Sequence, residues 1–318
     1  MTDLAAFEGI IPKEAGPADP RVDVALMSSS TFSSPAAQAT GSTANTNTAT
    51  EARPQMGVRG VTSEAMSSST DGLVLYDLTS KPGARQTFSP HCIKTVLALR
   101  LLDIGYDRQR RTFHQIRTEL AQRVSDRVTV PTLELSNGSH LTDSWAIALY
   151  LAQKHPQGSL LFPNGAASKA LASLLNTWGP KIFGPRIQAL SRPRIYDLLD
   201  PASARYFEEE KCGKAKLDKM RAMRPEERQA HLEACKAALE LVESALAESK
   251  RGAPPFSRWL EGGELPSHAD FVVYGFYGYS KTAGPAVVKE IWNAHPNVAQ
   301  WVQDMTEWAG KDITADFL

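Results

Sequence analysis

Cysteine is scarce in this sequence, and charge of neither sign dominates it. The 318 residues include three cysteines at widely separated positions, Cys92, Cys212 and Cys235. Isolated thiols of this kind form neither a metal-binding pattern nor a disulfide framework, and they indicate a reducing compartment, so we predict a cytoplasmic protein. Lysine and arginine together number 35, as do aspartate and glutamate. This balance gives no reason to expect nucleic acid or a membrane surface as a partner.

Long apolar runs and paired histidines are also missing. No apolar run approaches the roughly 18 residues that a membrane-spanning helix needs. The seven histidines show no HExxH or other paired spacing, so we expect no metal site. The chain is long enough for one large domain or two ordinary ones.

Residues 1–71 contain few large apolar side chains. Serine, threonine, alanine and glycine dominate residues 27–70, and such a segment cannot bury enough surface to offset the entropy of ordering. Acidic residues among the first twenty argue against a secretory or mitochondrial leader. The sequence therefore predicts a disordered tail, with a short docking segment as the alternative.

Residues 72–157 alternate between strand and helix patterns. The apolar run Leu73–Leu78 predicts a buried strand. Ser89 is a good helix cap, and Pro90 is pre-shaped for the first helical position. Behind them, apolar residues recur at helical spacing and predict a buried helix face. A helix N-terminus that carries a hydroxyl can bind a thiol or an anion, although an ordinary capped helix has the same pattern.

The rest of this segment completes a small sheet. We expect a second strand over 111–116, with the basic run at 108–111 as a solvated face, and then a short polar helix over 119–124. Asn137-Gly138 between two extended runs predicts a hairpin. Asp143 or Thr142 then caps another helix. The predicted order is βαβαββα, a sheet with helices on its faces.

Every strong pattern in residues 165–312 is helical. Gly179-Pro180 kinks or ends the first helix. The segment 267–270 is a capping box in its acidic form, followed by an apolar run that predicts a central buried helix. Asn297 is expected to cap the last helix. These patterns predict a bundle of five or six helices.

This organisation resembles the cytosolic glutathione transferases, in which a thioredoxin-like α/β domain precedes an all-α helical bundle. Four stretches carry the resemblance, and they occur in order at the expected spacing: 88–90, Val130-Pro131, Asp143-Ser144 and 267–270. The segments LYDL, FSPH, VPTLEL and LTDSWAIALYLAQKHP are similar to the corresponding segments of the β-etherase-like transferases and their fungal relatives. The resemblance implies a glutathione-binding enzyme of a family that is commonly dimeric, which makes a homodimer an expectation here.

The resemblance assigns Ser89 to the activation of the glutathione thiol. A free thiol with a pKa of about 8.5 is only a few per cent ionised at neutral pH. A hydroxyl donated to the thiolate contributes roughly 1.5–3 kcal/mol, and a helix N-terminus adds about 0.3–1 kcal/mol. Together these lower the thiol pKa by about two units, which makes the thiolate the main species at pH 7.

The same resemblance predicts which residues bind the rest of glutathione. It implies a cis bond at Val130-Pro131, with the backbone of Val130 pairing with the cysteinyl main chain of glutathione. Ser144 at a helix start suits the γ-glutamyl carboxylate, and Asp143 either pairs with the γ-glutamyl ammonium or only caps the helix. For the glycyl carboxylate the sequence leaves three candidates open: Lys94, Arg117 and Arg123.

The sequence does not identify the pocket for the second substrate. Trp178, Phe183 and Tyr206 are aromatic candidates, but aromatic residues at helical spacing are usually core. Cys92 lies three residues after Ser89, and a serine at the first position excludes dithiol exchange through this pair, so Cys92 is expected to be a small buried side chain.

The sequence predicts a transferase that presents glutathione to an aromatic or otherwise hydrophobic small-molecule electrophile. Two enzymatic variants stay open: cleavage of β-aryl ethers, and a step in making an aromatic secondary metabolite. A rival from another class is a non-catalytic carrier that binds glutathione or polyphenols without turnover.

Overall fold

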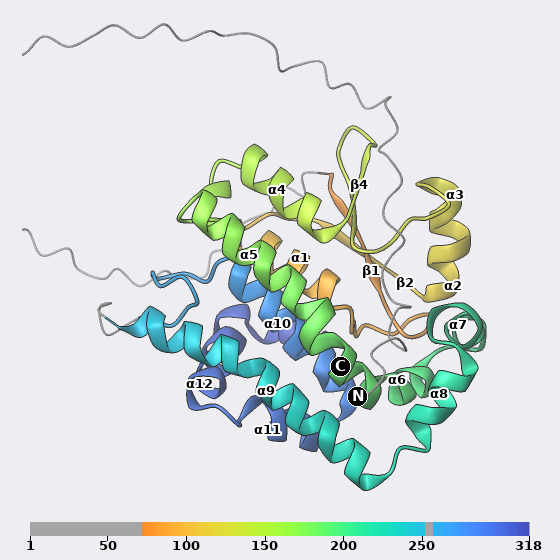
Figure 1. The fold of residues 1–318 in the computed structure, drawn as a ribbon. Helices are drawn as coiled ribbons and strands as arrows, with labels where there is room; N and C mark the ends of the chain where they lie inside the picture. The colour runs from red at the N-terminus through yellow and green to blue at the C-terminus, as the bar shows by residue number, and fades with distance from the viewer. Residues whose placement is uncertain (1–71, 252–256, 318) are drawn as a thin grey trace, which may run out of the picture. The chain divides into compact units, whose positions relative to one another are not determined.

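The computed structural model describes residues 72–251 and 257–317, and the structural statements below concern these residues (Figure 1). The tail predicted over residues 1–71 lies outside them. Within these two ranges, no helix combines the length and the apolar character needed to cross a membrane.

A four-stranded mixed sheet forms the first half, in the spatial order β2-β1-β3-β4. Strand β1 (Val74–Leu78) pairs in parallel with β2 (Asp107–Arg111) and antiparallel with β3 (Thr132–Glu134), which pairs antiparallel with β4 (His140–Thr142). A parallel pair needs a crossover, and α1 (Pro90–Leu101) supplies it. The β3–β4 hairpin turns at Gly138, whose φ is +79°, so the predicted Asn-Gly turn is confirmed.

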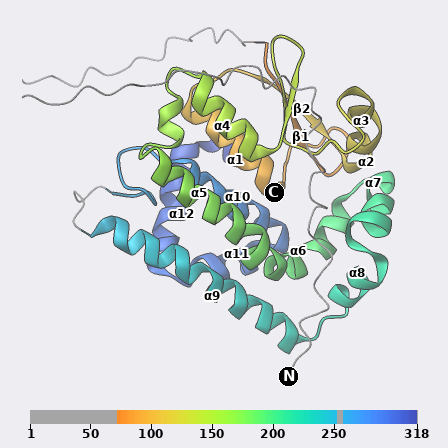
Figure 2. The same ribbon diagram turned by 45° about the horizontal axis from the view of Figure 1, so that its top comes forward.

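Helices cover both faces of this sheet (Figure 2). Helix α1 packs beside α4 (Ser144–Lys154). The other helical run comprises α2 (Phe113–Gln115), the π-helical segment Ile116–Leu120 and α3 (Ala121–Arg123). The predicted βαβαββα order and fold class are therefore confirmed.

The predicted second strand over 111–116 is wrong, because the strand lies at Asp107–Arg111 and residue 112 already caps a helix. Thr112 forms a capping box with Gln115. The basic run 108–111 is also not a solvated face: the side chains of Arg108 and Arg110 are 11% and 19% exposed. Buried carboxylates pair with both arginines, and this neutralisation allows so polar a run to form a strand.

The second half is helical throughout and includes more helices than predicted. Its described residues form nine α-helices: α5 (Ala166–Trp178), α6 (Gly184–Leu198), α7 (Pro201–Tyr206), α8 (Lys214–Arg221), α9 (Pro225–Lys250), α10 (His268–Ser280), α11 (Pro285–Trp292), α12 (Pro296–Ala309) and α13 (Lys311–Thr314). Four of these have only four to eight residues, too few for a clear apolar period. The expected kink at Gly179-Pro180 is a π-helical segment, Gly179–Phe183, between α5 and α6.

The predicted cap of the last long helix is wrong as well. Asn297 lies within the first turn of α12, and His295 occupies the capping position. A carboxylate from another helix serves this helix start instead: Glu243 of α9 accepts the amide protons of Asn297 and Val298 at 3.3 and 3.0 Å. A cap supplied from a distant helix leaves no local pattern in the sequence.

Helix α10 is the core of the bundle, and it packs against α1. The capping box predicted at its start is present, with Ser267 and Asp270 bonded to each other's backbone or side chain, and nearly every α10 residue is buried. Gly275 lies directly against the backbone of Pro90 at the first turn of α1, and Gly278 lies against Ile93. Glycines at the crossing let the two helices approach closely.

Candidate functional site

Ser89 lies where the loop after β1 enters α1. Its backbone is extended, and its hydroxyl accepts a hydrogen bond from the Cys92 amide at 3.3 Å, so Ser89 caps the helix as predicted. The side chain is nearly buried, with 6% of the residue exposed. Because the hydroxyl oxygen acts as acceptor in this bond, its proton is left for another acceptor.

The Val130–Pro131 peptide bond is cis, as the resemblance implied. Val130 is half-buried and immediately precedes β3. Among the described residues, neither its amide nor its carbonyl has a hydrogen-bond partner. A half-buried backbone with both groups free is a ready edge for an extended ligand backbone.

Asp143 and Ser144 begin α4. The Asp143 carboxylate accepts the amide protons of Trp145 and Ala146, each at 2.9 Å. Its φ of +88° is unusual for a residue other than glycine, and such strain is often found at functional sites. Ser144 is buried, and its amide and hydroxyl have no partner within the part of the chain that the structure describes.

The strand register brings these three positions to one end of the sheet. Thr132, at the start of β3, lies opposite both Tyr76 near the end of β1 and Thr142 at the end of β4. The loop to Ser89, the Val130–Pro131 bond and the start of α4 all adjoin this end. Separate stretches of sequence therefore contribute to one site.

The three cationic candidates have different surroundings. Arg123 forms an ion pair with Glu134 at 2.7 Å. Lys94 is buried and donates to the side-chain Oδ1 of Asn176 at 2.5 Å; burial lowers the pKa of Lys94 to about 8, and the charge of Asp143 opposes that shift. Arg117 donates to the Val128 carbonyl, just before the cis bond, and has no carboxylate partner among the described residues.

Aromatic and cationic groups gather near the Ser89 loop. Phe113 contacts Phe88 and Tyr206 with ring centroids 6.0 Å apart in both cases, and the Lys211 ammonium lies 5.2 Å from the Phe113 centroid. Lys211 is exposed to solvent, yet surrounding protein and the charges of Arg192 and Arg117 lower its pKa to about 8.

The other aromatic candidates belong to the core. Trp178 and Phe183 are 3% and 0% exposed, and the Trp178 indole donates to the Ala238 carbonyl at 2.9 Å. Cys92 is fully buried, as expected, and burial raises its thiol pKa well above the ordinary value. His91 is half-buried, and burial with the charges of Lys94 and Lys211 lowers its pKa to about 3, so it is neutral at pH 7.

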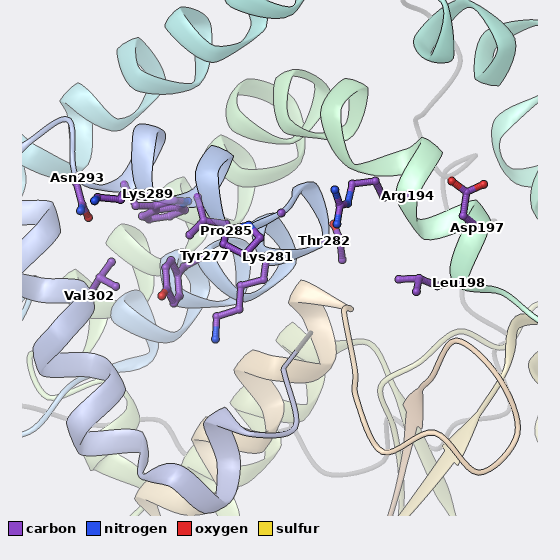
Figure 3. Close-up of a pocket in the computed structure, with 13 residues that line it drawn as sticks. Arg194, Asp197, Leu198, Tyr277, Lys281, Thr282, Pro285, Lys289, Asn293 and Val302 are labelled. Carbon is purple, nitrogen blue, oxygen red and sulfur yellow. The ribbon is translucent and has the colours of Figure 1, made fainter.

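A separate cavity of about 760 Å³ lies among α6, α10 and α11. Figure 3 shows side chains that line it, among them Tyr277 and Lys281 from the α10 region and Arg194 from α6. Ser89 is not among its lining residues. This cavity is therefore separate from the candidate site at Ser89.

Sequence reasoning missed two contributions to the site. Lys211 follows an acidic run and gives no local sign that it lies over Phe113, close to His91. The C-terminal residues Asp316 and Phe317 follow the helical region predicted over residues 165–312, yet they contact the Ser89 loop. The available sequence signal for this contact was an acidic residue followed by an aromatic residue, shortly after the last predicted helix.

Solved structures of similar fold are glutathione transferases. GSTFuA3 from Phanerochaete chrysosporium matches with a TM-score of 0.60 and 19% identity, covering 79% of this chain and 98% of that chain. A glutathione S-transferase of Ceriporiopsis subvermispora in complex with glutathione matches with a TM-score of 0.59 and 17% identity, over 76% and 98% of the two chains. The Tau class enzyme from mango, Mangifera indica, gives 0.55 and 16%, over 77% and 94%. At these identities the similarity concerns the fold.

Family models match the two halves in turn. The model for the N-terminal domain of glutathione S-transferase matches residues 88–154, which include Ser89, Val130-Pro131 and Asp143-Ser144. The model for the C-terminal domain of glutathione S-transferase matches residues 170–313. With both domains matched in order and the fold shared, the chain belongs to the cytosolic glutathione transferase superfamily.

Proposed function

We propose that this protein is a glutathione transferase in which Ser89 activates the glutathione thiol. The observation that carries the proposal is the strand register, which brings the segments that carry Ser89, Val130 and Ser144 to one end of the sheet. Within the described residues, the Val130 backbone and Ser144 have no hydrogen-bond partner there. An extended tripeptide can satisfy these groups together. Its thiolate would accept the Ser89 hydroxyl proton at the N-terminus of α1, which also favours negative charge.

Replacing Ser89 tests this proposal. We expect Ser89→Ala to raise the pKa of the bound thiol and to lower turnover at neutral pH about ten-fold or more, since a factor of ten corresponds to about 1.4 kcal/mol. The measurements are the pH dependence of thiolate absorbance in the glutathione complex and of conjugation to a model electrophile.

Ser89→Thr is the matched control, because threonine keeps a hydroxyl that can both cap and donate. We expect it to retain most of the thiolate. Thermal melts separate loss of the cap from loss of activation, since cap removal costs about 0.5–2 kcal/mol of stability. Wild-type rates and thiolate absorbance in Ser89→Ala would remove Ser89 from the mechanism.

We assign the two ends of glutathione to different cations. Arg117, beside the cis bond and without a carboxylate partner among the described residues, suits the glycyl carboxylate. Lys94, within range of the Asp143 charge, suits the γ-glutamyl carboxylate together with Ser144. Asp143 then faces the γ-glutamyl ammonium while it caps α4.

For the second substrate we propose a hydrophobic, aromatic electrophile. The half-buried ring of Tyr206, which packs on Phe113 near the Ser89 loop, supports this class, because aromatic faces stack with aromatic ligands. Cleavage of β-aryl ethers and a step in aromatic secondary metabolism both use substrates of this class. Turnover of a panel of aryl ethers, quinones and halogenated aromatics with glutathione distinguishes them.

The rival function is a carrier that binds without turnover. A glutathione-affinity column and the model-electrophile assay separate the two: retention with conjugation supports the enzyme, and retention without conjugation supports the carrier. Failure to be retained would count against both.

We also propose that the protein acts in the cytoplasm as a homodimer. The three cysteines are free thiols, which fits a reducing compartment. Leu174 on α5 and Ile182 on the π-helical segment after it are 69% and 42% exposed. These apolar side chains offer a surface for a second copy.

A further inference from the structure

The C-terminal segment 311–317 returns to the loop that carries Ser89. After α13, the Asp316 carbonyl accepts the Thr87 amide proton at 2.7 Å. Thr87 and Phe317 form a single parallel β-bridge. Thr87 is fully buried and lies two residues before Ser89, so the end of the chain forms part of the wall behind the proposed thiol-activating residue.

Phe317 anchors this segment to the helical half. Its side chain is 5% exposed, and its ring centroid lies 6.1 Å from that of Tyr274 on α10. The Lys281 ammonium lies 5.6 Å from the Phe317 ring. The segment therefore contacts α10 on one side and the Ser89 loop on the other.

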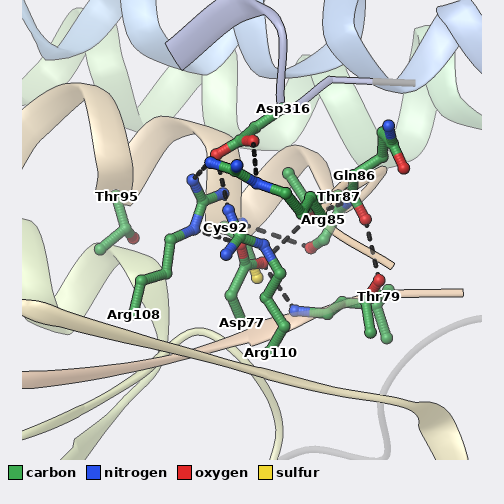
Figure 4. Close-up of polar contacts among 12 residues, drawn as sticks. Asp77, Thr79, Arg85, Gln86, Thr87, Cys92, Thr95, Arg108, Arg110 and Asp316 are labelled. Atoms are coloured by element: carbon green, nitrogen blue, oxygen red, sulfur yellow. Dashed lines mark hydrogen bonds and ion pairs between the residues drawn. The ribbon is translucent and has the colours of Figure 1, made fainter. Parts of the chain in front are cut away.

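Charges from three parts of the chain meet beneath this contact, as Figure 4 shows. The Asp316 carboxylate, in a residue only 8% exposed, accepts from Arg108 at 2.9 Å and from Arg110 at 2.6 Å, both on β2. Arg108 also donates to the Asp77 carboxylate of β1 at 2.6 Å. One arginine thus joins a carboxylate on β1 to one near the C-terminus.

The chain of contacts continues to Ser89. The Thr87 hydroxyl donates to Asp77 at 3.0 Å and accepts the Ser89 amide proton at 3.4 Å. Thr87 is therefore held through its amide by the Asp316 carbonyl and through its hydroxyl by Asp77. The direction of the Ser89 backbone as it enters α1 depends on both.

We propose that Asp316 is a positioning residue for Ser89, and that the segment 311–317 is a clasp that sets the Ser89 hydroxyl at the mouth of α1. This inference rests on the proposed role of Ser89. The clasp joins the C-terminal end of the described residues to the loop that precedes Ser89. Asp316 touches no reacting atom and acts through Thr87, Arg108 and Asp77.

The test compares Asp316→Asn with Asp312→Asn in the full-length protein. Asp312 lies on the same segment but pairs with Arg100 at the surface, where its side chain is 69% exposed, so it is a matched control. We expect Asp316→Asn to lower kcat/KM for glutathione about ten-fold at neutral pH, since small misplacement of a reacting group is costly. The pH profile should move to higher pH, while KM for a model electrophile stays unchanged.

A second readout needs no substrate. Hydrogen exchange followed by mass spectrometry in the ligand-free protein should show faster exchange in peptides covering 86–93 for Asp316→Asn, and wild-type exchange for Asp312→Asn. Arg110→Gln is a milder variant that keeps the Arg108–Asp77 pair, and it should shift both readouts in the same direction by less. Asp316→Glu should restore part of the activity.

The outcomes are distinguishable. If wild-type protein binds no glutathione thiolate, the proposed function fails and the clasp fails with it. If the wild type holds a thiolate but Asp316→Asn leaves the pH profile and the exchange unchanged, only the clasp is overturned. A lower melting temperature with an unchanged pH profile would likewise overturn it, because it would show a purely structural role.

Discussion

At the scale of the residue, identical side chains differ in function because their partners differ. Arg117 and Arg123 lie six positions apart on one helical run; Arg117 donates to Val128 in the loop before β3, and Arg123 donates to Glu134 on β3. Arg123 is neutralised by Glu134. A hydrogen bond from Tyr76 and the charge of Arg123 lower the pKa of the Glu134 carboxyl. Arg117 meets only a carbonyl oxygen among the described residues, so its charge is available to a ligand.

Arg117→Ala tests this difference. We expect KM for glutathione to rise about ten-fold, since a charge-assisted hydrogen bond contributes roughly 1.5–3 kcal/mol, while kcat changes little because the thiol is not touched. Arg123→Ala is the control, and as half of a largely exposed pair it should change KM less than about two-fold. Steady-state kinetics with varied glutathione decide the matter; a larger effect from Arg123→Ala would reverse the assignment.

At the scale of the element, the close approach of α1 and α10 positions the loop that carries Ser89. The first turn of α1 carries Ser89 at its cap, and this turn rests on Gly275 of α10. A methyl group at Gly275 would overlap the Pro90 carbonyl, which is backbone and cannot rotate away. At Gly278 it would overlap the end of the Ile93 side chain, which can adopt another rotamer.

We therefore expect Gly275→Ala to be the more damaging of two identical substitutions. Overpacking of this kind costs about 1–3 kcal/mol of unfolding free energy, and displacement of the α1 terminus should also raise the thiol pKa. Gly278→Ala should be milder, because alanine favours a helix over glycine by about 1 kcal/mol and Ile93 can adjust. Urea unfolding and thiolate titration measure both; equal losses would contradict the packing argument.

At the scale of the whole molecule, the proposed dimer makes a mass prediction. One chain has a mass of 34.7 kDa, and light scattering should give twice that value. Leu174→Lys should dissociate the dimer, because a buried leucine contributes roughly 1.5–3 kcal/mol per copy and a lysine there would be desolvated. Leu265→Lys is the control at another exposed leucine, 45% exposed. A wild-type mass of a single chain would exclude the dimer.

Much of the site was predictable because its signals are local. Ser89 with Pro90 caps α1, Asn137-Gly138 turns the hairpin, and Ser267 with Asp270 starts α10, since each pattern acts within a few residues. The order of elements followed from these signals and from apolar spacing. The roles of Val130, Asp143 and Ser144 toward glutathione stay predictions.

What the sequence by itself determined is the order of elements and the helix mouth that carries Ser89, because caps and turns depend on neighbouring residues. Only the tertiary structure decided where the polar second strand lies, which arginine has no carboxylate partner among residues 72–251 and 257–317, and what holds the Ser89 loop. Arg108 can lie within a strand because Asp77 and Asp316, one of them more than 200 positions away, neutralise it. Burial of a charge depends on partners that only the folded chain brings together.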